Sequence, residues 1–376
     1  MNYTKLVFAT SALALSVSSA QAAPSINWYG FVDIGLEKYT ETGVNGGSDI
    51  FQGADTPNGN SNEKQLALSN NVQSRISLKG EEALEDGWKG SYRMEFRANV
   101  LDDGGQALRT RLGWLAVSKG EHSFKVGAQW SPLFGYSAWN THRSESHGYG
   151  SYYYTTDTDQ LLGSQAYGYR NDSVISYTYG SGPYTASPFT TTVALHVADD
   201  NRGSDAGLYN DSGITAVTVG AAATFGNLTV NGVLLKSMVK ESDVAKAENV
   251  DLTAPSLVGF GGKFQASDVL DFGFAYRQID RDTDKDSVRS AVEASVQYQI
   301  NDKVDLHVGA ATGEDEDDTQ RQLDSNIYGQ LMYQVSDSRH VRFEFERVDY
   351  GKSDVNGTQK DLGNAHILLF SMRQGF

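Results

Sequence analysis

The last nine residues of the chain, 368–376, read LLFSMRQGF and indicate the fold class. Large apolar side chains recur at every second position, interrupted only by Gln374: Leu368, Phe370, Met372 and Phe376. Successive side chains of a β-strand point to opposite faces, so this period predicts a strand with two chemically different faces. We therefore expect a final strand that closes a sheet and turns one row toward an apolar environment.

Residues 1–22 have the pattern of a secretory signal peptide. Lys5 is followed by a mostly apolar run at 6–17, and Ala20-Gln21-Ala22 is a small-x-small cleavage site. A transmembrane anchor would need about 20 apolar residues, more than this run contains. We predict that residues 23–376 form the mature protein, and the absence of a linker or composition shift predicts a single domain.

Composition excludes several classes of protein. The chain has no cysteine, so an exported form would contain no disulfide bonds. Its net charge is −16, and removal of Lys5 with the signal peptide would make it −17. Such acidity argues against nucleic-acid binding. Mean hydropathy is −0.43, yet a β-barrel can cross a membrane at this value because only alternate residues meet lipid.

Strand-like alternation recurs along the chain and is clearest at 288–300 and 88–99. In the first run, Val292 and Val296 alternate with Glu293 and Gln297. The runs are joined alternately by short turns and by longer polar loops. The predicted strands are 26–39, 70–80, 88–99, 107–118, 123–132, 168–179, 187–198, 212–225, 227–239, 255–265, 269–279, 287–300, 303–312, 323–335, 339–350 and 362–376. Residues 227–239 are apolar on both faces.

This even number of strands predicts an all-β protein, a 16-stranded antiparallel transmembrane β-barrel. Aromatic residues gather at the short-turn ends of the strands, as an interfacial girdle would require. A soluble sandwich or solenoid is the alternative. A sandwich would rarely place so many charges on the second row of sixteen strands, and no fixed-length repeat supports a solenoid.

A barrel of this size holds water, so its function depends on the side chains that point inward. The alternation places a basic stripe on one arc of the lumen wall, from the second to the sixth strand. Its members are Arg75, Arg93, Arg97, Arg109, Arg111, Lys125 and Arg170. They could pair with carboxylates such as Glu95 and Glu344, or they could line the permeation path and set a transverse field.

The longest loop, 133–167, is rich in aromatic residues and glycine, and a loop of this length in a compact domain is usually functional. We expect it to fold into the barrel and narrow the lumen; an ordinary external loop is the alternative. The candidate constriction residues are Tyr136, Trp139, Arg143, Glu145, Tyr152, Asp157 and Asp159.

Over its mature length the chain resembles the general porins of the Gram-negative outer membrane. The resemblance rests on Trp28–Gly35 (WYGFVDIG), Ser74–Glu81 (SRISLKGE), Thr110–Leu112, Tyr169–Asn171 and the closing Phe376. It implies a trimer of sixteen-stranded barrels, a constriction loop after the fifth strand, and a basic wall that faces acids on that loop. It also implies that the ending, with Phe370, Met372 and Phe376, is a signal to the barrel-assembly machinery.

Individual positions both match the family pattern and depart from it. Arg75, Arg111 and Arg170 match the wall arginines of the family, with Arg109 as a neighbour. Phe31 stands where the family has a lysine on its first strand, and the loop lacks the usual Pro-Glu-Phe-Gly-Gly stretch.

We expect a passive diffusion channel for small hydrophilic solutes, embedded among outer-membrane lipid and lipopolysaccharide, with no enzymatic activity and no cofactor. The acidic mature charge predicts a mild cation preference. The alternatives are an oligosaccharide channel with Trp139, Tyr149 and Tyr152–Tyr154 as a stacking track, and a structural or adhesive barrel. Residues 280–286 resemble a calcium loop but lack the Gly and Glu that such a loop requires. Residues 313–318 are interpreted as a solvated external loop, with divalent cations that bridge it to lipopolysaccharide as the alternative. We assign no metal site.

Overall fold

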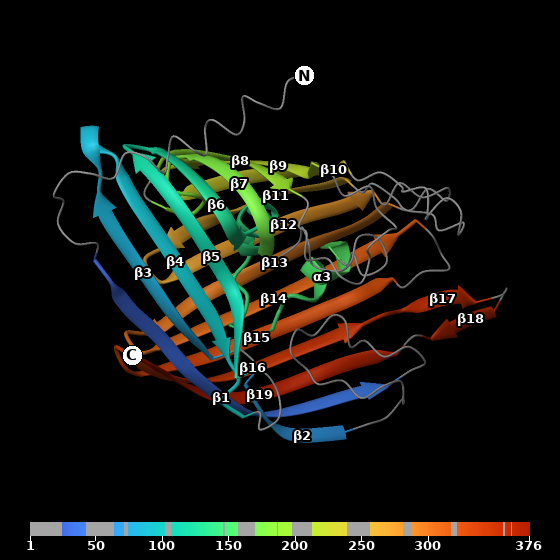
Figure 1. Cartoon of the computed structure of the whole chain (residues 1–376). Helices are drawn as coiled ribbons and strands as arrows, with labels where there is room; N and C mark the ends of the chain where they lie inside the picture. The colour runs from blue at the N-terminus through green and yellow to red at the C-terminus, as the bar shows by residue number, and fades with distance from the viewer. Residues whose placement is uncertain are drawn as a thin grey trace.

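The computed structural model describes residues 25–42, 64–70, 74–101, 107–145, 147–156, 170–185, 187–197, 213–238, 256–280, 288–316, 322–355, 358–361 and 363–376. Its barrel strands pair in antiparallel fashion and form one closed barrel (Figure 1). The barrel strands are β1 (Asn27–Thr42), β2 (Lys64–Ser69), β3 (Arg75–Ala83), β4 (Lys89–Ala98), β5 (Leu108–Lys119), β6 (His122–Trp130), β7 (Arg170–Tyr179), β8 (Phe189–Val197), β9 (Ile214–Phe225), β10 (Leu228–Ser237), β11 (Ser256–Ser267), β12 (Leu270–Asp280), β13 (Val288–Asn301), β14 (Val304–Asp315), β15 (Leu323–Ser336), β16 (Arg339–Asp349) and β19 (Asn364–Gly375).

The second position of the barrel is shared by two strands, β2 and β3. Both pair with β1, β2 opposite its second half and β3 opposite its first. Between them the Ser74 hydroxyl accepts a hydrogen bond from Asp33 N at 2.8 Å, and Ser74 N donates to Asn70 Oδ1 at 2.8 Å. The sheet of 17 strands is therefore a barrel of 16, as predicted, although the prediction of one strand at 70–80 missed β2.

The barrel closes where β1 pairs with β19, from Phe31 opposite Gly375 to Thr42 opposite Asn364. On β19, Phe370 and Met372 face outward with 58% and 51% of their surface exposed. Ile367 and Leu369 alternate with them and are completely buried on the inner side. The predicted two-faced final strand is confirmed.

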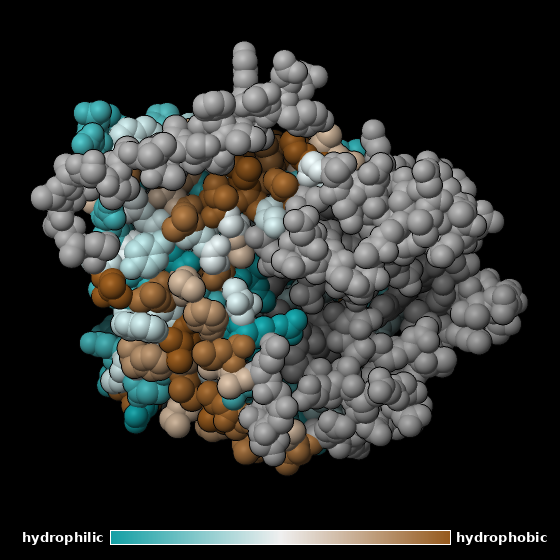
Figure 2. All heavy atoms as spheres, viewed as in Figure 1, coloured by the Kyte–Doolittle hydropathy of each residue, from teal (hydrophilic) through white to brown (hydrophobic). Residues whose placement is uncertain are grey.

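Polar and apolar side chains are distributed in the reverse of a soluble protein. Large apolar residues such as Leu115 and Phe225 are exposed on the outside, whereas Glu293, Glu344 and Arg342 are buried inside. Figure 2 shows hydrophobic residues gathered on the outer face of the strands. A soluble sandwich would bury its apolar rows, so the outside of this barrel is built for an apolar medium. Among the described helices, none has the length and apolarity to cross a membrane.

Short elements complete the described structure: η1 (Glu85–Gly87), α2 (Pro132–Ser137), η2 (Ala138–Asn140), α3 (Gly150–Thr156), and the hairpin of β17 (Lys352–Val355) and β18 (Thr358–Asp361). One interpretation of an acidic segment was wrong. β14 continues to Asp315, whose buried carboxylate accepts a hydrogen bond from Arg289 Nε at 2.9 Å, so Gly313, Glu314 and Asp315 are not a solvated loop.

Candidate functional site

Residues 131–145 and 147–156, in the connection from β6 toward β7, lie inside the barrel (Figure 1). Its first helix, α2, packs against β9, β10 and β11, and its second, α3, packs against β12 to β15. Ser131 starts α2, because its hydroxyl accepts a hydrogen bond from Leu133 N at 3.2 Å and Pro132 follows as the first helical residue. We call the described residues 131–145 and 147–156 the inward loop.

An apolar contact holds the first half of the inward loop. Leu133 and Tyr136 of α2 pack into a buried cluster that includes Val233 and Leu235 of β10. The Tyr136 hydroxyl also hydrogen-bonds to Thr192 Oγ1 of β8 at 2.9 Å. This contact explains why residues 227–239 are apolar on both faces: one row faces outward and the other receives the loop.

Glycines on the inner wall allow the backbone of the loop to come close. A Cβ at Gly273 would lie 2.6 Å from Asn140 O, and one at Gly261 would lie 2.5 Å from Asn140 Nδ2. Real side chains do not tolerate such distances, so glycine is required where η2 crosses β11 and β12.

Glu293 of β13 is the central polar anchor of the loop. Its Oε2 accepts hydrogen bonds from Arg143 Nη2 at 2.7 Å, Arg277 Nη2 at 2.5 Å and Ser151 Oγ at 2.5 Å. Its Oε1 accepts hydrogen bonds from the hydroxyls of Thr141 and Tyr328, both at 2.6 Å. Arg143, Ser151 and Thr141 belong to the loop, so one buried carboxylate joins three loop residues to the wall.

Two further carboxylates, both on β16, hold the turn before α3. His147 Nδ1 lies 2.8 Å from Glu344 Oε2. Gly148 N and Gly150 N donate hydrogen bonds to Glu346 at 2.7 and 3.1 Å. Gly148 has φ +82°, and a Cβ there would lie 2.8 Å from the Tyr328 ring, so no other residue fits this turn.

The sequence prediction missed Glu293, Glu346 and Arg277 as anchors. Each is a charged residue on the inner row of a strand, which is the one signal that could have identified them.

The two histidines of the loop differ in charge because their neighbours differ. Burial disfavours the charged form of His147, but the hydrogen bond to Glu344 and the charges of Glu344, Glu346 and Glu37 raise its pKa above the ordinary 6.5. Burial above all, with the charges of Lys263 and His307, lowers the pKa of His142 to about 3. At neutral pH we therefore expect a charged His147 and a neutral His142.

The pKa of His147 leads to a prediction about pH. A raised folded-state pKa gives stability that is complete below the unfolded pKa of 6.5 and is lost as the pH rises through the folded value. His147→Gln should therefore be less stable than the wild type at acidic pH, and the difference should shrink as the medium becomes alkaline. The thermal transition of the detergent-folded barrel measures this at each pH. A difference that stays constant across pH would contradict a charged His147.

The far part of the loop reaches the seam of the barrel. The Glu145 carboxylate forms an ion pair with Arg373 of β19. Arg373 Nε donates to Asp33 Oδ2 of β1 at 2.9 Å, and Arg342 of β16 holds both Asp33 oxygens at 2.6 and 3.0 Å. The loop therefore covers the arc of the inner wall from β8 to β19.

The opposite arc carries the predicted basic stripe. Glu95 of β4 is buried among it and contacts Arg75 at 3.7 Å, Arg93 at 2.6 Å and Arg111 at 2.9 Å. Three members of the stripe, Arg75, Arg93 and Arg111, therefore pair with Glu95. Glu344, the other carboxylate considered from the sequence, instead binds Arg342 and His147 on the far wall.

Aromatic rings and neighbouring strands position the remaining basic side chains. Lys125 Nζ lies 4.6 Å above the Trp114 ring, and Arg170 lies 5.5 Å above Trp130. Arg97 and Arg109 are directly opposite each other on β4 and β5. We call the seven residues Arg75, Arg93, Arg97, Arg109, Arg111, Lys125 and Arg170 the basic wall.

Only part of the predicted constriction set faces open space. Trp139 is 43% exposed and Glu145 is partly exposed, whereas Tyr136, Arg143 and Tyr152 are buried against the wall. Asp157 and Asp159 lie outside the described residues. Tyr149 and Tyr154 are buried as well, so most of the predicted stacking track for sugars is inaccessible.

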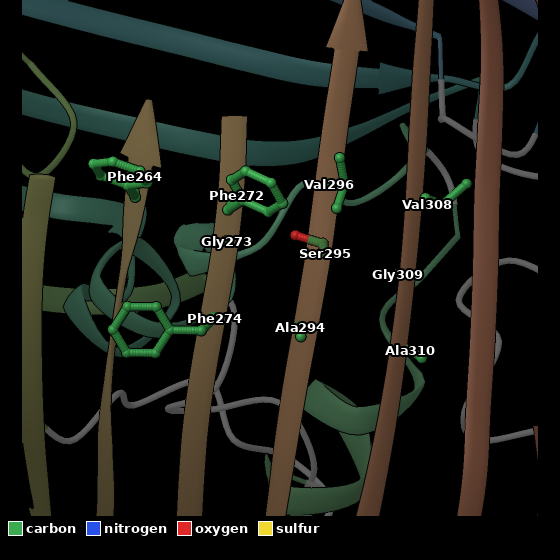
Figure 3. Close-up of a pocket in the computed structure, with 10 residues that line it drawn as sticks. All are labelled: Phe264, Phe272, Gly273, Phe274, Ala294, Ser295, Val296, Val308, Gly309 and Ala310. Atoms are coloured by element: carbon green, nitrogen blue, oxygen red, sulfur yellow. The ribbon is translucent and has the colours of Figure 1, made fainter. Parts of the chain in front are cut away.

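A groove of about 580 Å³ lies on the other side of β11 to β14 (Figure 3). Phe264, Phe272, Phe274 and Val308 line it and are exposed on the outer face. It is therefore part of the outer apolar surface and is separate from the lumen. Within the described residues, no group of three metal-ligating side chains could hold a metal ion.

Comparison with known proteins finds a matching family model and several solved structures of similar fold. The sequence model described as "Gram-negative porin" matches residues 9–354. Among solved structures, an anion-selective porin from Comamonas acidovorans matches with TM-score 0.69 and 13% identity, covering 94% of this chain and 100% of that one. OmpF of Salmonella typhi in complex with daunomycin matches with TM-score 0.63 and 14% identity, covering 95% and 100%. The trimer form of Vibrio cholerae OmpT matches with TM-score 0.62 and 16% identity, covering 94% and 100%. At these identities the structures show a common fold. No curated protein sequence matches.

Proposed function

The chain belongs to the Gram-negative porin family and forms a passive-diffusion channel in the outer membrane, and from this premise we propose that it prefers anions. Solutes pass between the basic wall and the inward loop. The proposal rests on the charges of the two surfaces that border the path, the basic wall on one side and the inward loop on the other.

On one side, seven cationic side chains share an arc of wall whose buried carboxylate, Glu95, is already in contact with three of them. On the other side, Glu145 of the loop is paired with Arg373. Glu293, Glu344 and Glu346 are buried beneath the loop and bonded to it. Among the described residues at this height, cationic side chains outnumber the carboxylates that face the path, which supports a positive local field that favours anions in a narrow, low-dielectric passage.

This proposal reverses the mild cation preference expected from the net charge. Net charge describes the whole surface, whereas selectivity depends on the field at the narrowest part of the path. The porin from Comamonas acidovorans, which has the same fold, is an anion-selective channel, and this supports the proposal by analogy alone.

The reversal potential in a potassium chloride gradient across a planar bilayer tests the proposal. We expect the sign of a chloride-selective channel, and Arg170→Gln should lower the chloride-to-potassium permeability ratio by about twofold, because Arg170 stands over Trp130 at the lumen. Arg347→Gln is the matched control, since Arg347 pairs with Asp349 on the exposed outer row of β16. A potassium-selective reversal potential would contradict the proposal.

We also propose a homotrimer without enzymatic activity. A trimer form is known for one protein of this fold, and the outer apolar surface offers room for subunit contacts. Lipopolysaccharide and the assembly machinery stay predicted partners. Among the other functions, the buried Tyr149, Tyr152 and Tyr154 weaken the oligosaccharide track. A purely structural barrel would show no conductance in the same bilayers.

A further inference from the structure

The turn that joins β7 to β8 holds one residue in an unusual backbone conformation. Residues 182–185 form a tight turn with Pro183 and Tyr184 at its centre. Tyr184 has φ +58°, in the left-handed region that L side chains seldom adopt. Proline followed by a residue of positive φ is the pattern of a type II turn, in which the second of these positions is usually Gly or Asn. A tyrosine there is strained, so the contacts of its side chain must offset the strain.

The hydroxyl of Tyr184 joins the inward loop to the barrel wall. It donates a hydrogen bond to Asn140 Oδ1 of η2 at 2.6 Å and accepts one from Asn231 Nδ2 of β10 at 2.8 Å. Asn140 is completely buried, and Asn231 belongs to the same inner row of β10 as Val233. The short turns of an outer-membrane barrel face the periplasm. Tyr184 therefore reaches into the barrel from the periplasmic end and contacts the loop there.

Both the backbone and the ring of this residue are held in place. Gly182 N donates a hydrogen bond to Thr190 Oγ1 of β8 at 3.1 Å, and Thr190 Oγ1 donates to Tyr179 O at 2.8 Å, so the turn is attached to the ends of both strands. Lys263 Nζ of β11 lies 4.9 Å from the centroid of the Tyr184 ring, within the range of a cation–π contact. The turn can therefore act as a fixed support.

The supported residue is next to a side chain that faces open space. Asn140 ends η2 and directly follows Trp139, which is 43% exposed. The Trp139 ring lies edge-on to Phe134, with 5.4 Å between the ring centroids. On the other side of Asn140, Thr141 is bonded to Glu293. A displacement of Asn140 would therefore carry Trp139 with it.

We infer that Tyr184 is a positioning residue of the channel: it supports η2 from the periplasmic side and fixes how far Trp139 extends into the path. Glu293 and Glu346 hold the loop from the side wall, whereas Tyr184 holds it from the end of the barrel. The inference concerns the width and steadiness of the path. It does not depend on the proposed ion preference, so its test measures the steadiness of the current and not the selectivity.

Single-channel recording of two Tyr184 variants is the test. Glycine adopts positive φ without strain, so Tyr184→Gly should keep the turn while it removes the ring and the hydroxyl. We expect the time spent at altered conductance levels to rise about tenfold, because two buried hydrogen bonds are lost. Tyr184→Phe keeps the ring beside Lys263 and should give a smaller rise. Tyr333→Phe is the matched control, since Tyr333 is 44% exposed on the outer row of β15.

A double-mutant cycle with Asn140→Ala distinguishes positioning from general stabilisation. If Tyr184 acts through Asn140, Tyr184→Phe should add little fluctuation in the Asn140→Ala background. The heat-dependent gel shift reports whether each variant folds. A folded Tyr184→Gly channel with wild-type current levels and steadiness would overturn the inference. So would additive effects of Tyr184→Phe and Asn140→Ala, because the hydroxyl would then act elsewhere.

Discussion

Glu293→Gln should lower the stability of the barrel by about 3–5 kcal/mol and detach the inward loop from its wall, because it removes one member of a buried ion network. The side chain keeps its size, but Arg143 and Arg277 lose the carboxylate that neutralises both of them. Both guanidinium groups are completely enclosed, so water cannot replace the lost partner. A detached loop would leave a wider path.

Two measurements report these effects. Unfolding of the detergent-folded protein by denaturant gives the change in stability, and single-channel recording should show a larger and noisier conductance. Glu81→Gln is the matched control: Glu81 pairs with Lys89 at 3.3 Å, both side chains are more than half exposed, and such pairs contribute about 0–1 kcal/mol. A Glu293→Gln variant with wild-type stability and conductance would show that the loop does not depend on this anchor.

Arg342→Leu should destabilise the closure of the barrel by a similar amount, about 3–5 kcal/mol. Arg342 lies on β16 and binds both carboxylate oxygens of Asp33 on β1, across the intervening β19. Its Nε also donates to Glu344 at 2.5 Å. Leucine would leave Asp33 with Arg373 and Glu344 with His147, so two buried carboxylates would each lose a partner at the seam.

The heat-dependent gel shift is the readout, since a barrel that does not close runs as unfolded chain. We expect Arg342→Leu to lose the folded band at a lower temperature than the wild type. Arg347→Leu on the same strand is the control, because Arg347 is about half exposed and its contact with Asp349 is 3.4 Å. Equal melting of the two variants would mean that the Asp33–Arg342 contact does not secure the seam.

The alternation of side chains was enough to predict the barrel, because period 2 is a local property of each strand. It predicted the outward row of Phe370 and Met372 and the opposite faces of Val292 and Glu293. It failed at the second strand, where Asn70 and Ser74 join β2 to β3 through their own hydrogen bonds instead of a continuous ladder.

The docking of the inward loop was only partly visible in the sequence. Its length and aromatic content predicted that it enters the barrel, but its partners lie on strands more than a hundred residues away. Two irregularities did mark the docking arc. The doubly apolar strand 227–239 receives α2, and the apolar inner residues Ile367 and Leu369 mark a dry part of the lumen, where Ile367 joins the cluster of Tyr154 from α3.

The departure at Phe31 also has a physical explanation in the structure. The ring stands where the family has a lysine, and two guanidinium groups lie against it, Arg75 and Arg373. Phe31 therefore adds no charge but holds two existing charges beside the lumen. The absence of the family lysine suggests that the basic wall carries less positive charge at this position. The contacts of Phe31 show instead that its ring holds the guanidinium groups of Arg75 and Arg373 in place.

We propose that solutes pass between the basic wall and the inward loop, and thiol labelling is a direct test of this claim. The chain has no cysteine, so Arg109→Cys introduces a single reactive site. A bulky, negatively charged methanethiosulfonate added to the bath should reduce the single-channel current in steps in Arg109→Cys, and should leave it unchanged in Leu115→Cys, where the side chain is on the outer face. Labelling of Arg109→Cys, verified by mass, with no change in current would contradict the claim.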